Sequence, residues 1–145
     1  MAWALPENVL KRFQHDDPYK LLERQGKVVA RLDQRGSFAI ALREYLAKRG
    51  IELEPRAKIA NIRDAVSAEH EVALLILTND TRRRLARKLG AIRPRAGELN
   101  RFYVRFTEEK DPDAGKAMVA WLAVHRVALA AARPGIVVVM IQDSE

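Results

Sequence analysis

Basic side chains concentrate in one short stretch of this 145-residue chain. Between Arg82 and Arg105 nine basic residues accompany one acidic residue, Glu98, which gives a local charge of +8. The flanking segments are nearly neutral, and the net charge of the whole chain is +7. A charge concentrated in so few residues builds a positive potential that an extended polyanion can recognise. The sequence therefore predicts nucleic acid as the partner.

The expected contact residues come from three consecutive segments. A predicted helix at 81–89 supplies its cations, the loop after it supplies two arginines, and a predicted strand at 101–107 supplies its outward side chains. Arginine and lysine bind phosphates, and an aromatic side chain can stack on or flank a base. The predicted contacts are Arg82, Arg83, Arg84, Arg87, Lys88, Arg93, Arg95, Arg101, Tyr103 and Arg105.

The helix predicted at 81–89 has an unusual outward face. Asn79 and Asp80 are expected to cap it, with Leu85 and Leu89 facing inward. Several cations are four residues apart, and three arginines stand in the first turn, where the helix dipole favours anions. Together these mismatches cost up to about 1 kcal/mol. A bound polyanion would offset that cost, whereas the alternative is an ordinary solvated basic face.

Residues 101–107 alternate strictly between apolar and polar types, which predicts a half-buried strand. Its core-facing side would carry Phe102, Val104 and Phe106. The order of helix, loop and strand across 81–109 resembles the recognition helix and wing of winged-helix domains. This resemblance implies a helix that enters the major groove and a hairpin that touches the flanking backbone.

The first half of the chain is predicted to be helical, because its apolar residues recur with a helical period between proline starts and glycine stops. A β-hairpin formed by 27–32 and 37–42 is an alternative, since a turn-like sequence separates these two segments. The expected helices span 6–14, 18–36, 37–50 and 55–66.

The second half mixes element types. Residues 72–77 form a continuous apolar run that suits a helix slightly better than a buried strand. A long apolar helix is expected at 113–132, and a buried strand at 136–141. The sequence thus predicts one α+β domain over residues 1–145, with 82–105 as its nucleic-acid-contacting region and DNA favoured over RNA.

Enzymatic readings find less support. The chain has no cysteine, its glycines form no phosphate-binding loop, and its serines and histidines are scattered. If 72–77 is a strand, Asp80 and Asp143 each follow the carboxyl end of a buried strand, and the pair could hold Mg²⁺ in a nuclease-like site. Helix capping by Asp80 is the preferred explanation, so no catalytic residue, metal site or cofactor is predicted.

Two expectations concern association and location. The nearly all-apolar helix at 113–132 predicts burial of Trp121 and Leu122 in the core or in a homodimer interface. A dimeric regulatory module that binds an acidic protein is therefore a further alternative. The sequence shows no secretory signal and no span of about 20 apolar residues, so a cytoplasmic protein without membrane contact is expected.

Overall fold

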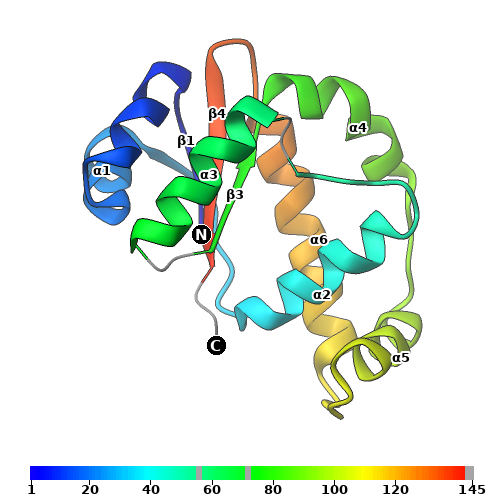
Figure 1. Ribbon diagram of the computed structural model, residues 1–145. Helices are drawn as coiled ribbons and strands as arrows, with labels where there is room; N and C mark the ends of the chain where they lie inside the picture. The colour runs from blue at the N-terminus through cyan, green and yellow to red at the C-terminus, as the bar shows by residue number, and fades with distance from the viewer. Residues whose placement is uncertain (55–56, 71–72, 143–145) are drawn as a thin grey trace.

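The computed structural model describes residues 1–54, 57–70 and 73–142, which form an α+β fold (Figure 1). A four-stranded antiparallel sheet lies between two layers of helices. Alternate residues of the strands at 2–6, 73–77 and 136–142 point into the two separate cores on either side, as in Leu75 and Leu77 against Leu74 and Ile76. The predicted fold class is confirmed.

The sheet pairs the two ends of the chain. Its strands are β1 (Ala2–Pro6), β2 (Lys27–Ala30), β3 (Ala73–Leu77) and β4 (Ile136–Gln142), in the order β2-β1-β4-β3. Ala2 lies opposite Met140 in the central pair, and Leu77 lies opposite Val138 at the β3 side. Every neighbouring pair is antiparallel, so the amino end of β4 meets the carboxyl ends of β1 and β3.

Two strand predictions have clear outcomes. The strand predicted at 136–141 is confirmed as β4, whose β-branched side chains are buried on both faces. The slight preference for helix at 72–77 is wrong, because β3 completes the sheet and takes both faces of its apolar run into the cores; Val72 lies outside the described residues.

One helical layer comprises η1 (Glu7–Gln14), α1 (Pro18–Gln25) and α3 (Ala57–His70). Asp17 caps α1 as its sequence predicts, because its carboxylate accepts hydrogen bonds from the backbone N–H of Tyr19 at 2.9 Å and of Lys20 at 3.3 Å. The helix predicted to reach Gly36 ends instead at Gln25. Gly26 is extended there, and the chain turns into β2. Pro55, the expected start of α3, lies outside the described residues.

The other layer comprises α2 (Gly36–Ala47), α4 (Asn79–Ala91), α5 (Ala96–Thr107) and α6 (Ala114–Ala131). The helix predicted at 37–50 is confirmed as α2, and Gly50 follows it with a positive φ of 76°. The alternative of a hairpin is right about a strand at the start of 27–32, which is β2, but wrong about its partner, since β2 pairs with β1 and 37–42 is helical.

The long apolar helix is α6, which packs on α2, α4 and α5. Trp121 and Leu122 are buried in the core, as expected. Within the described part of the chain, α6 alone is long and apolar enough to pass as a membrane span by length and composition, and 56% of it is buried inside the protein. Such burial is typical of a core helix.

The strand predicted at 101–107 is wrong, and with it the wing of the winged-helix arrangement. These residues belong to α5, which buries Leu99, Phe102 and Tyr103. The alternation of apolar and polar residues over seven positions also fits a helix once Leu99 is included, because positions i, i+3 and i+4 then share one face. Tertiary packing on α6 decides between the two periods.

Candidate nucleic-acid interface

The N-cap of the basic helix α4 lies one residue before the two expected caps. Thr78 is the N-cap, and its hydroxyl accepts a hydrogen bond from the backbone N–H of Thr81 at 3.3 Å. Asn79 and Asp80 therefore lie in the first turn and do not cap it. Asp80 instead forms an ion pair with Arg84, with 3.1 Å between the carboxylate and Nε. An acidic side chain at this place also suits the helix dipole.

α4 attaches to the fold through a narrow stripe. Thr81, Leu85 and Leu89 are buried at successive turns, and the helix packs chiefly against α6. The opposite side is exposed and strongly basic; the name "α4 basic face" is used below for Arg83, Arg84, Arg87 and Lys88. Among the described residues, Arg83, Arg87 and Lys88 have no acidic side chain within ion-pair distance. Their charges are therefore directed at solvent.

Two arginines occupy the C-terminal end of α4. Arg126 of α6 donates from Nε to the carbonyl of Leu89 at 3.0 Å and also bonds the carbonyl of Ile92. Arg93 donates to the carbonyl of Ile92 at 2.9 Å and also bonds that of Gly90. Burial, and secondarily repulsion from Arg93, lower the pKa of Arg126. Arg93, predicted as a nucleic-acid contact, thus has a second task at the end of the helix.

The remaining predicted contacts divide by exposure. Arg95, Arg101 and Arg105 are exposed, whereas Arg82 is half-buried and donates to the Asn79 side chain at 3.3 Å. Tyr103 is only 1% exposed, because it faces the core from α5. Its predicted role as the aromatic that stacks on or flanks a base is therefore wrong in this structure.

The basic segment follows one side of the molecule. From the end of α4 the chain descends through residues 92–95 to α5, which lies at the other end of α6 (Figure 1). The exposed cations of α4, the loop and α5 thus succeed one another along this descent. The structure separates them over two helices and does not bring them into one compact cluster.

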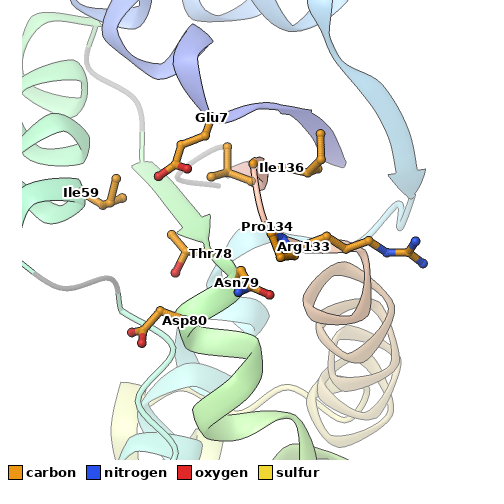
Figure 2. Close-up of a pocket in the computed structure, with 10 residues that line it drawn as sticks. Glu7, Ile59, Thr78, Asn79, Asp80, Arg133, Pro134 and Ile136 are labelled. Carbon is orange, nitrogen blue, oxygen red and sulfur yellow. The ribbon is translucent and has the colours of Figure 1, made fainter.

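A pocket of about 300 Å³ lies at the N-terminal end of α4 (Figure 2). Its polar lining comes from Glu7, Thr78, Asn79, Asp80 and Arg133, and in the view shown the Arg133 side chain points away from both carboxylates. No group of three histidine, cysteine, aspartate or glutamate side chains suitable for a metal ion occurs among the described residues. The pocket adds an acidic rim beside the α4 basic face.

Sequence reasoning did not identify Glu7 or Arg133 as neighbours of Asp80. They come together because β1 pairs with β4, and the backbone N–H of Glu7 donates to the Gly135 carbonyl at 2.8 Å. The three residues belong to segments far apart in the sequence, so no local spacing announces the pocket.

Comparison with models of protein families, with curated proteins and with solved structures gave no match. The case for function therefore depends on the geometry of this chain alone.

The carboxylate pair of the nuclease alternative loses its structural basis. That alternative required Asp80 and Asp143 to follow strands whose C-terminal ends lie at the same end of the sheet. β3 and β4 are antiparallel, with Leu77 opposite Val138 and Ala73 opposite Gln142. Their C-terminal ends therefore lie at opposite ends of the sheet. Asp143 itself lies outside the described residues.

Proposed function

We propose that this protein binds DNA through the α4 basic face and acts without catalysis. The observation that carries the proposal is the exposure of all four cations, with Arg83 and Arg87 opposite the stripe by which α4 is attached and Arg84 and Lys88 beside it. A helix held this way can enter a groove without displacing its own packing partners. Its cations can then neutralise phosphates, which supplies most of the affinity for a polyanion.

The dimensions of α4 favour DNA over RNA. A helix of 13 residues is about 20 Å long, and the major groove of B-form DNA, about 12 Å wide, admits such a helix. The major groove of A-form RNA is too narrow and deep for side chains to read. Arg95, Arg101 and Arg105 would contact phosphates beyond the groove occupied by α4.

The test is the salt dependence of duplex DNA binding. If on the order of five cations meet phosphates, log affinity should fall with log salt at a slope of about −4. Replacing Arg83, Arg84 and Arg87 together by alanine should reduce that slope to between about −1 and −2. A slope near zero in the parent, or a triple variant that binds like the parent, would refute the proposal.

A matched triple variant controls for the loss of charge as such. Lys11, Lys20 and Arg24 are exposed cations in η1 and α1, in the opposite helical layer. Their replacement by alanine removes the same formal charge and should change the slope far less. The assay is run with and without Mg²⁺, and Mg²⁺-dependent cleavage of the DNA would refute binding without catalysis.

A further inference from the structure

α5 presents a partly exposed aromatic ring beside exposed cations. Phe106 is 43% exposed, and the ring of Phe102 stacks behind it with 5.9 Å between centroids and an interplanar angle of 13°. Tyr45 of α2 then packs edge-on against Phe102, with 5.4 Å between centroids. The exposed ring is thus the end of a supported column of three aromatic side chains.

Polar contacts hold the inner end of this column. The hydroxyl of Tyr45 donates to the Glu98 carboxylate at 3.0 Å, and Arg49 forms an ion pair with the same carboxylate at 3.2 Å. The Arg49 guanidinium lies 3.5 Å from the centroid of the Tyr45 ring. These contacts tie α2 to α5, so the orientation of the column is fixed before any ligand arrives.

Three cations lie along the same surface of α5 and the end of α2 as the column. Arg101 and Arg105 are exposed one helical turn apart on α5, and Arg105 adjoins Phe106 in the chain. Lys48 places Nζ 5.3 Å from the centroid of the Phe102 ring. No ion pair to these three cations occurs among the described residues. The backbone turns at Glu108, with a φ of 60°, so the following acidic residues leave the line of the helix.

The combination of an exposed aromatic ring and cations without ion-pair partners indicates which class of ligand suits this surface. An apolar protein surface would meet one ring among positive charges, whereas a nucleotide offers a flat π-face for the ring and a phosphate for the arginines. We propose that an unpaired base stacks on Phe106, while Arg105 contacts a phosphate beside it and Arg101, whose guanidinium lies near Gly97, contacts one nearer the duplex. The preferred ligand is then duplex DNA that carries a single-stranded extension, with the duplex on α4 and the extension on α5.

The proposal builds on the proposed DNA-binding function and also replaces the aromatic residue named from the sequence. Tyr103 was the expected stacking residue, and the helical conformation of 101–107 buries it. The same conformation exposes Phe106, which the strand interpretation assigned to the core. Arg95 is exposed on the segment that joins the two helices and lies on the expected path of the DNA backbone.

The experiment compares three DNA ligands by fluorescence anisotropy, two of which carry the same number of phosphates. They are a blunt duplex, the same duplex with a short single-stranded extension, and that duplex with an abasic extension. Because stacking of a base on an aromatic side chain is worth roughly 5- to 150-fold in affinity, the extension with bases should bind tighter than its abasic counterpart by that factor. The difference isolates stacking from phosphate contacts.

Substitutions at Phe106 test whether this side chain causes the higher affinity for an extension with bases. Phe106→Ala should abolish the advantage of bases over abasic sites and leave affinity for the blunt duplex unchanged, while Phe106→Trp should retain the advantage. Val127→Ala on α6, a residue that is 51% exposed, is the control for loss of an exposed apolar side chain. No advantage of bases in the parent, or an advantage that survives in Phe106→Ala, would overturn the proposal.

The outcomes separate this inference from the function on which it builds. If the α4 basic face does not bind DNA, the parent protein will not bind the blunt duplex, or the triple variant at Arg83, Arg84 and Arg87 will bind it as tightly as the parent does. If Phe106 does not stack on a base, the advantage of bases over abasic sites will be absent or independent of Phe106, while blunt-duplex binding and its salt slope remain. Extension binding that requires Phe106 without any duplex binding would support the stacking site and refute the role of α4.

Discussion

Arg126 donates a hydrogen bond from Nε to the carbonyl oxygen of Leu89 at 3.0 Å, and this contact joins the central helix α6 to the end of the basic helix α4. Its second bond, to the carbonyl of Ile92, reaches past the last turn. The final carbonyls of a helix have no partner within the helix, so a cation supplied from α6 both satisfies them and fixes where α4 ends. Arg126 is therefore a positioning residue for the α4 basic face.

Replacing Arg126 by alanine should loosen the last turn of α4. Hydrogen bonds from a charged donor contribute about 1.5–3 kcal/mol, so amide hydrogen exchange in α4 should accelerate at least about 10-fold. DNA affinity should fall several-fold even though Arg126 is not part of the contact face. Arg31→Ala, at an exposed arginine beyond β2, is the control. Unchanged exchange in α4 would contradict this role.

Gly115 at the start of α6 lies against the first residue of α5. A Cβ at this position would overlap the backbone carbonyl of Ala96, whereas a Cβ on Gly97 would meet only Arg101 Nη1 at 3.7 Å. Gly115→Ala should therefore lower the free energy of unfolding by about 1–3 kcal/mol. Gly97→Ala should raise it by up to about 1 kcal/mol, because alanine favours the helix. Urea denaturation of the two variants checks the pair; equal midpoints would contradict it.

Long segments with a consistent helical period were the predictable part of the fold. α2 and α6 were located from apolar spacing with glycine or proline at their ends, and β4 from its run of β-branched residues. β1 carried no comparable signal, and β2 appeared only in the hairpin alternative, with the wrong partner. These strands are five and four residues long. They form because β1 pairs with β4 and β2 pairs with β1, which is a property of the tertiary structure.

The candidate site was predictable as composition and only in part as geometry. The cations of α4 are exposed as their spacing indicated, because Leu85 and Leu89 fix which side of the helix is buried. The prediction was wrong at 101–107, where seven residues fit both the period of a strand and that of a helix. As a result Tyr103 was expected to be exposed and is buried, and Phe106 was expected to be buried and is exposed. The pocket at Glu7 depends on contacts between distant segments and left no trace in local sequence.

The outer side of α6 predicts self-association. Val119, Ala123 and Val127 are exposed at successive turns of this helix. Because a second copy could cover this stripe and double the basic surface, we expect a homodimer with higher affinity for long DNA. Sedimentation at micromolar concentration should give the dimer mass, and the double substitution of Val119 and Val127 by glutamate should give a monomer.

A matched control for the dimer lies on another helix. Ile40 of α2 is as exposed as Val119, so Ile40→Glu controls for each single glutamate introduced at an apolar surface position, and it lies away from the stripe. It should leave the dimer intact. A parent protein that sediments as a monomer at the highest soluble concentration would remove the prediction altogether.

His125 makes the stability of the fold sensitive to mild acid. Its side chain is fully buried, and burial, together with repulsion from Arg43, lowers its pKa from 6.5 to about 4. The Trp121 carbonyl, 2.7 Å from Nδ1, can only accept, so Nδ1 carries the proton of the neutral ring. Nε2 is buried without a hydrogen-bond partner, so protonation there would leave a charge unsolvated.

The contribution of His125 to stability should therefore be lost progressively as the pH is lowered from 6.5 to 4. In that window the unfolded chain binds a proton at this histidine and the folded protein does not, so the loss approaches about 3 kcal/mol. Urea denaturation of His125→Leu should lack this component. His15→Gln, at an exposed histidine, should retain it. An NMR titration of the parent supplies a measurement independent of any variant's folding: an imidazole of His125 that titrates near pH 6.5 would contradict the assignment.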